Sequence, residues 1–81
     1  MNYSARVDVK LRNGIADPQG QTIERALPAL GYAGVGDVRV GKLIELTLDA
    51  SDADEARIRV LEMCEKLLAN PVIESYEVTI R

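Results

Sequence analysis

Hydrophobic and polar residues alternate along the first segment of the chain. The apolar positions there share one parity: Tyr3, Ala5, Val7, Val9 and Leu11. Alternation with a period of two is typical of a half-buried β-strand with one solvated face, as in antiparallel sheets. We therefore expect a strand over residues 3–11, which the dipeptide Asn13-Gly14 ends.

A helix is expected between Asp17 and Gly31. The Asp17 carboxylate can accept from free amides of a first helical turn, and Pro18 suits the first position, where its missing N–H costs nothing. Apolar residues follow at helical spacing: Ile23, Ala26, Leu27 and Leu30. Gly31 suits a left-handed stop. Two residues fit a helix poorly. Gly20 lies in the first turn, and Pro28 removes a backbone hydrogen bond, so a kinked or loosened last turn is expected.

The segment from Val38 to Asp49 allows two structures. Its apolar residues share one parity, which Lys42 interrupts: Val38, Val40, Ile44, Leu46 and Leu48. The pleat excludes a hairpin with a two-residue turn at Gly41-Lys42, because that register would place the two halves of the set on opposite faces. One long strand kinked at Gly41 keeps the set together, and so does a hairpin with the three-residue loop Gly41-Lys42-Leu43. We favour the long strand. At about 40 Å it would project beyond its own core and would need a partner to cover it.

A second helix and a third strand complete the pattern. Ser51-Asp52-Ala53-Asp54 approximates a capping box, and an apolar stripe follows it: Ala53, Ala56, Val60, Met63, Cys64 and Leu67. A second apolar line, Ile58, Leu61 and Leu68, indicates either a partner surface or scattered exposed aliphatic residues. Asn70-Pro71 ends the helix. The last strand places Val72, Tyr76, Val78 and Ile80 on one face.

The order β-α-β-α-β predicts a single α+β domain over residues 1–81, an antiparallel sheet with two helices on one face. With 47% hydrophobic and 28% charged residues and a net charge of −3, the composition is that of a soluble globular domain. A chain of 81 residues buries a marginal core. Because disulfides and an evident metal site are missing from the sequence, oligomerisation, as a dimer, is the expected support.

Composition also restricts the chemistry. The chain has no histidine and a single cysteine, which removes Ser-His-Asp and Cys-His nucleophilic sites, histidine-bearing zinc sites and an internal disulfide. The acidic balance argues against nucleic-acid binding. No apolar run is long enough to span a membrane, and no signal peptide opens the chain. We expect a cytoplasmic protein with no nucleic-acid or membrane partner.

The remaining candidates for chemistry have simpler interpretations. Cys64 lies on a core stripe, and burial explains it. The carboxylates of Asp52, Asp54 and Glu55 cap a helix. Gly41-Lys42 lacks the flanking residues of a phosphate-binding loop. Lys42 still interrupts an apolar face. This favours one of two positions: either it faces a partner or lies at a bulge, or it lies at the tip of a turn. From the residues alone we expect no catalytic, cofactor-binding or metal-binding residue.

Several stretches resemble, in order and spacing, the PurS subunit family of phosphoribosylformylglycinamidine (FGAM) synthase, and together they cover nearly the whole chain. They are residues 14–20, ending Asp17-Pro18-Gln19-Gly20, then Leu30-Gly31-Tyr32, residues 38–42, Met63-Cys64 and residues 67–74. Pro28 departs from the family pattern, which has a helix-compatible residue there. This departure concerns the end of the first helix.

The resemblance implies a place in de novo purine biosynthesis. The complete enzyme converts formylglycinamide ribonucleotide (FGAR) to FGAM with ATP, Mg and glutamine, and the PurS subunit would bind no cofactor itself. It would be a non-catalytic dimer, or a tetramer, that bridges the glutaminase PurQ and the synthetase PurL. Loop exposure and the matching motifs select the candidate partner contacts: Arg39, Gly41, Lys42 and Leu43, then Gly14 and Asp17. The alternative is a small dimeric regulatory module that binds a ligand.

Overall fold

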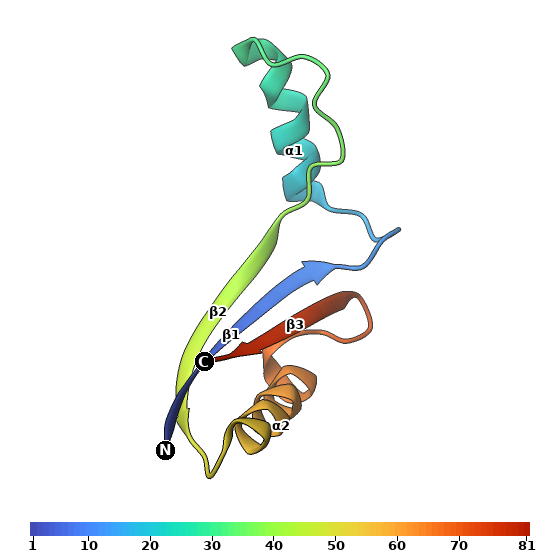
Figure 1. Ribbon diagram of the computed structural model, residues 1–81. Helices are drawn as coiled ribbons and strands as arrows, with labels where there is room; N and C mark the ends of the chain where they lie inside the picture. The colour runs from blue at the N-terminus through green and yellow to red at the C-terminus, as the bar shows by residue number, and fades with distance from the viewer.

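The computed structural model describes residues 1–81 and contains one antiparallel sheet of three strands, in the order β2-β1-β3 (Figure 1). The elements along the chain are β1 (Asn2–Leu11), α1 (Pro18–Ala26), a 3₁₀ turn η1 (Leu27–Leu30), β2 (Gly41–Asp49), α2 (Ala53–Met63), a π turn η2 (Cys64–Leu68) and β3 (Glu74–Ile80). The predicted α+β class and β-α-β-α-β order are confirmed.

Strand β1 lies in the centre, and its alternation decides which face of the sheet becomes the core. Val7 lies opposite Ile44 of β2 and Val78 of β3, so one parity of all three strands makes a continuous apolar face. The other face carries the polar residues, among them Arg6 opposite Glu45 and Thr79.

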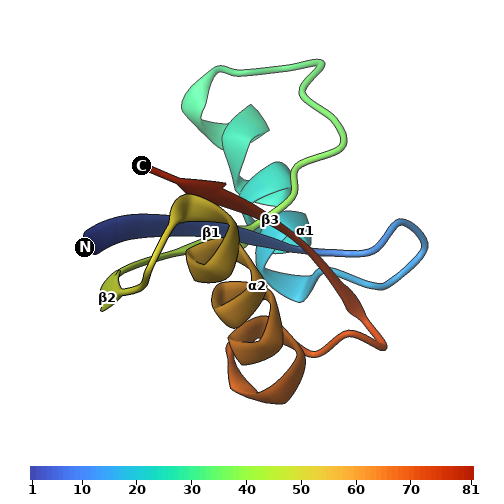
Figure 2. The same ribbon diagram turned by 60° about the horizontal axis from the view of Figure 1, so that its bottom comes forward.

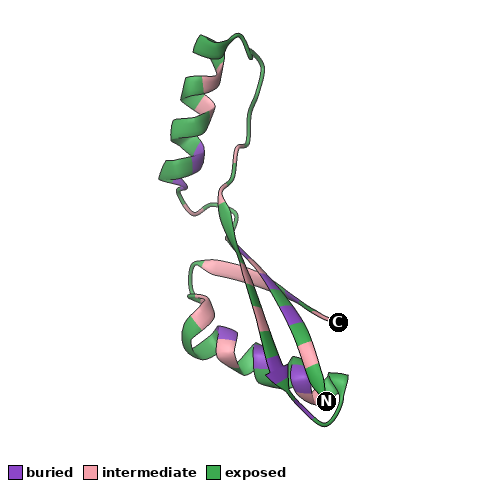
Figure 3. Cartoon of the chain, turned by 90° about the vertical axis from the view of Figure 1, so that its left-hand side faces the viewer, coloured by how far each residue is buried: buried purple, intermediate pink, exposed green.

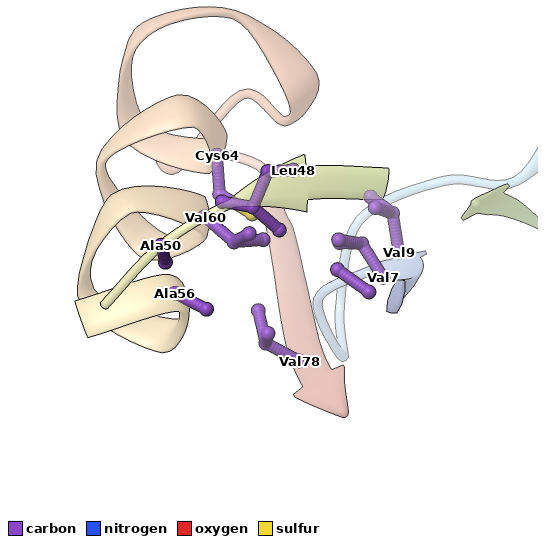
Figure 4. Close-up of a cluster of buried hydrophobic side chains, with 9 residues drawn as sticks. Val7, Val9, Leu48, Ala50, Ala56, Val60, Cys64 and Val78 are labelled. Carbon is purple, nitrogen blue, oxygen red and sulfur yellow. The ribbon is translucent and has the colours of Figure 1, made fainter. Parts of the chain in front are cut away.

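Helix α2 covers the apolar face over β1 and β3 (Figure 2). Its capping residue is Asp52, whose carboxylate accepts from the Glu55 amide at 2.8 Å. Side chains from the helix and the strands interdigitate in a single cluster (Figure 4). The buried apolar residues are Ala5, Val7, Val9, Leu48, Ala50, Ala56, Val60, Cys64 and Val78.

The π turn at the end of α2 changes which residues reach that core. A π turn adds a residue to the helical repeat and rotates the following side chains. Leu68 therefore packs against the core, whereas Leu67, expected on the core stripe, is exposed. Ala53 at the start of the helix and Val72 before β3 are exposed as well, contrary to expectation.

Helix α1 does not pack on the sheet, so the expectation of two helices on one face holds only for α2. Figure 1 shows α1 beyond the end of the sheet, with the chain returning beside it to β2. Residues 18–40, called the arm below, bury only Gly20 (Figure 3). An apolar stripe indicates that one side of a helix packs against another surface, but it does not indicate which surface that is.

The end of α1 follows the prediction from Pro28. The α-helix stops at Ala26, and the next four residues form a 3₁₀ turn, because Pro28 has no N–H to continue the α-helical ladder. Gly31 then adopts the left-handed conformation with φ 95° and donates to Pro28 O at 3.1 Å.

Strand β2 begins at Gly41, and the hairpin alternative is wrong. Residues 41–49 pair without interruption with β1, from Gly41 opposite Lys10 to Asp49 opposite Asn2. The favoured long strand is shorter than expected, because residues 38–40 lie outside the sheet and belong to the arm.

The arm makes the molecule long and thin. Its principal extents are 52 × 25 × 14 Å and its radius of gyration is 16.4 Å, against about 12 Å for a compact domain of this length. The structure contains no helix of the length and hydrophobicity that crossing a membrane requires.

Candidate functional site

The six candidate contact residues lie around the place where the arm leaves the sheet. Asp17 caps α1, Arg39 belongs to the returning chain, and Gly41, Lys42 and Leu43 open β2. Asp17, Gly41 and Lys42 line one shallow hollow. Leu43 points to the polar face of the sheet opposite Asp8, and Gly14 lies in the exposed turn after β1.

Asp17 is the centre of this arrangement. Its side chain is buried, and its two oxygens accept from two different segments: Oδ1 from the Gly20 amide at 2.9 Å and Oδ2 from the Val40 amide at 2.8 Å. The hydrogen bond from Gly20, followed by that from Val40 and the charge of Arg39, lowers the pKa of Asp17 against the opposing effect of burial. The ionised carboxylate therefore ties the start of α1 to Val40, the residue before β2.

Two residues not selected from the sequence complete the contact. A Cβ on Gly20 would lie 2.3 Å from the Val38 carbonyl oxygen, so only glycine permits this approach of α1 to the returning chain. Glu24 accepts from the Val38 amide at 3.1 Å. We call Asp17, Gly20, Glu24 and residues 38–40 the junction. The unfavourable glycine in the first turn of α1 was the sequence signal that a backbone comes close there.

Arg39 supports the junction through hydrogen bonds from its side chain to backbone carbonyls at the end of β1 and in the segment after it. Its guanidinium donates to the carbonyls of Leu11, Arg12 and Ile15 at 3.2–3.4 Å and lies 3.9 Å from Asp17 Oδ2. The planar fork of arginine suits several acceptors at once. Arg39 is exposed like Lys42 and Leu43, but its guanidinium is engaged by backbone carbonyls at the end of β1 and in the turn that follows.

Gly41 is required for a different reason. A Cβ at this position would lie 2.4 Å from the carbonyl oxygen of Val9, so a side chain would push the first residue of β2 away from β1. Gly14 has nothing near it, but its φ of 86° favours glycine. Both glycines therefore shape the backbone around the junction.

The other titratable groups with shifted pKa values lie on the α2 side of the sheet. Burial raises the pKa of the Cys64 thiol, and the neighbouring Glu65 carboxylate raises it further. The hydrogen bond from Tyr76 to Glu65 raises the pKa of the Tyr76 phenol. Neither group takes part in the junction.

An elongated α+β domain whose exposed helical arm is held at its base by hydrogen bonds is typical of the class of small domains that form assemblies. The solvent-accessible surface is 5797 Å², whereas a compact monomer of this mass exposes about 4,800 Å². The excess is comparable to the surface that one partner buries in a standard interface.

The chain belongs to the PurS family, described as phosphoribosylformylglycinamidine (FGAM) synthase, which residues 4–81 match. The PurS subunit of Bacillus subtilis is 50% identical over 74 residues, covering 91% of this chain and 87% of that protein. The PurS subunit of Methanocaldococcus jannaschii is 42% identical over 78 residues, covering 96% and 94%.

Solved structures show the same fold. B. subtilis PurS in its C2 crystal form, 47% identical, has a TM-score of 0.86 and covers 98% of each chain. A chain in the structure of PurLQS from Thermotoga maritima, 38% identical, has a TM-score of 0.90 and covers 100% of this chain and 99% of that chain. The elongated arm is thus shared by a chain that is part of a larger complex.

Proposed function

We propose that this chain is the small, non-catalytic subunit of FGAM synthase in de novo purine biosynthesis. It bridges the glutaminase PurQ and the synthetase PurL, so that ammonia from glutamine reaches the ATP-dependent conversion of FGAR to FGAM. The observation that carries the proposal is the likeness, over the full length of both chains, to a chain of the T. maritima PurLQS structure.

The junction explains how so small a chain could act as a bridge. A bridging subunit has to hold its contact surfaces at fixed positions, because the two active sites must stay aligned. Arg39 ties the arm to the end of β1 through hydrogen bonds to the Leu11 and Arg12 carbonyls, and Asp17 and Glu24 hold the start of α1 and residues 38–40 together. The exposed residues next to the junction, Lys42 and Leu43, then present a fixed surface to a partner.

The subunit works as a homodimer, or as a tetramer built from two dimers, in the cytoplasm. It binds no cofactor of its own, and ATP, Mg and glutamine bind to the other subunits. The excess of exposed surface over that of a compact monomer supports self-association.

Reconstitution of the three subunits from one organism tests the bridging function. FGAM formation is measured with glutamine and, separately, with ammonium chloride as the nitrogen source. Omitting this chain should abolish the glutamine-dependent reaction and leave the ammonia-dependent reaction of PurL in place. Glutamine-dependent turnover that persists without this chain would overturn the proposal.

A further inference from the structure

The turn between β1 and α1 contains an asparagine followed by a glycine, which the proposed function does not use. Arg12, Asn13, Gly14 and Ile15 form a β-turn, closed by a hydrogen bond from the Ile15 amide to the Arg12 carbonyl at 3.1 Å. Asn13 and Gly14 are its two central residues, and both are exposed where the turn stands out from the sheet (Figure 1). The φ of 86° at Gly14 is that of the third position in a type II turn.

The peptide group between Asn13 and Gly14 makes no hydrogen bond within the chain. Neither the Asn13 carbonyl nor the Gly14 amide has a backbone partner, although the residues on both sides of them do. A Cβ added to Gly14 would meet nothing within 4 Å, so the space beside its nitrogen is open. Because glycine accepts φ of either sign, this peptide plane can rotate without breaking a hydrogen bond. Rotation brings the Gly14 nitrogen to the side-chain amide carbon of Asn13.

We propose that Asn13 is a site of spontaneous deamidation, at which the chain converts asparagine to a mixture of aspartate and isoaspartate. The Gly14 nitrogen attacks Cγ of Asn13, and the new N–Cγ bond closes a succinimide ring. The Cγ–Nδ2 bond breaks, and ammonia leaves with the proton of the Gly14 amide. Water then opens the ring. Opening at Cγ leaves aspartate, whereas opening at the main-chain carbonyl carbon leaves isoaspartate, in which the main chain runs through the former side chain.

The other two asparagines of the chain are protected from this reaction, although asparagine is in general a chemically labile residue. Asn70 precedes Pro71, whose nitrogen has no hydrogen, and its Oδ1 accepts from the Val72 amide at 3.1 Å. Asn2 lies in β1, paired with β2, and the side chain of Tyr3 stands beside the next amide. Asn13 is therefore the asparagine that the fold leaves reactive.

The modified turn is also the place where Arg39 anchors the arm. The Arg39 guanidinium donates to the Arg12 carbonyl at 3.2 Å and to the Ile15 carbonyl at 3.3 Å, one on each side of Asn13-Gly14. Isoaspartate adds a carbon atom to the main chain between these two carbonyls. Both can then no longer keep their places on one planar guanidinium, so the modification should loosen the base of the arm.

Ageing the intact chain tests the site. The purified chain is kept in mildly alkaline buffer, where the Gly14 amide loses its proton more readily, and peptide mapping by mass spectrometry follows each asparagine. Asn13 should be lost at least about tenfold faster than Asn2 or Asn70, a barrier lower by about 1.4 kcal/mol. An isoaspartyl methyltransferase with a labelled methyl donor should then label the aged chain. Asn13→Gln is the matched control, because its ring would be larger, and it should take up no label. If Asn13 lasts as long as Asn2 and Asn70 in the folded chain, the proposal is wrong.

Hydrogen exchange measured by NMR separates the longer main chain from the new charge. The Ile15 amide reports on the turn, because its hydrogen bond to the Arg12 carbonyl spans Asn13-Gly14. In the isoaspartate form, purified from the aged mixture by chromatography, this amide should exchange about tenfold faster than in the fresh chain, which corresponds to about 1.4 kcal/mol. Asn13→Asp carries the same charge on an unaltered main chain and should exchange like the fresh chain. Equal exchange in the isoaspartate form and in Asn13→Asp would overturn the effect on the arm.

Discussion

The carboxylate of Asp17 accepts a hydrogen bond from the backbone amide of Val40, 23 residues further along the chain, at a distance of 2.8 Å. The other oxygen of the same carboxylate accepts from Gly20. One side chain therefore caps a helix and holds the chain that enters the next strand. Together with the hydrogen bonds from Arg39 to the Leu11 and Arg12 carbonyls, this contact holds the arm where it leaves the sheet.

Replacing Asp17 by Asn should loosen the arm at neutral pH. An amide has one acceptor oxygen where the carboxylate has two, so either Gly20 or Val40 would meet an N–H group instead of an acceptor. Hydrogen exchange at the Val40 amide should become faster than in the wild type, and the urea midpoint at pH 7 should fall. An unchanged exchange rate at Val40 would contradict the role given to Asp17.

The stability of the wild type should depend on pH through the same carboxylate. Its pKa in the folded state lies below the ordinary value of 3.8, so its contribution is fully present above pH 3.8 and is lost as the pH falls toward the folded value. The difference in unfolding free energy between the wild type and Asp17→Asn should shrink over that range in urea titrations. If the unfolding free energies of the wild type and Asp17→Asn change in parallel with pH, the charge of Asp17 does not contribute to stability.

Gly20→Ala should destabilise the chain although alanine favours helices. Alanine in a helix gains up to about 1 kcal/mol over glycine, but here its Cβ would lie 2.3 Å from the Val38 carbonyl oxygen. We expect a net loss of about 1–3 kcal/mol in chemical denaturation. Gly36→Ala is the control. A Cβ there meets nothing within 4 Å, so its effect should stay within about 0.5 kcal/mol. A stabilising Gly20→Ala would refute the close approach.

Val60→Ala tests the core between α2 and the sheet. Val60 is fully buried, and removing two methyl groups leaves a cavity that should cost roughly 2 kcal/mol of unfolding free energy. Val72→Ala removes the same atoms from a side chain that is 81% exposed and should change stability by less than about 0.5 kcal/mol. Equal effects of the two substitutions would contradict the position of the core.

Lys42 and Leu43, the exposed candidates for partner contact, should contribute to binding of the other subunits. The double variant Lys42→Ala, Leu43→Ala should keep the fold and lower glutamine-dependent FGAM formation in the reconstituted complex by about tenfold, equivalent to about 1.4 kcal/mol of lost binding at limiting subunit. The ammonia-dependent rate should not change. Leu67→Ala, at an exposed position in η2 after α2, serves as the control. A glutamine-dependent rate equal to that of the wild type would remove these two residues from the partner surface.

Local patterns along the sequence were enough for the elements and for most of the core. Alternation over residues 3–11 predicts the central strand, Asp17-Pro18 predicts the start of α1, and Pro28 predicts the loosened turn that the structure shows. These signals succeed because strand periodicity, capping and the missing N–H of proline act over a few neighbouring residues.

Tertiary structure decided where α1 lies, where β2 begins and what Asp17 does. The sequence shows Asp17 as a helix cap and Gly20 as a poor helix residue, but both meet residues 38–40, which no local pattern connects to them. A helix with an apolar stripe needs a surface, and the sequence by itself does not distinguish the sheet of the same chain from that of another. The arm extends because hydrogen bonds and a close backbone contact between distant segments hold it there, and such contacts exist only once the chain has folded.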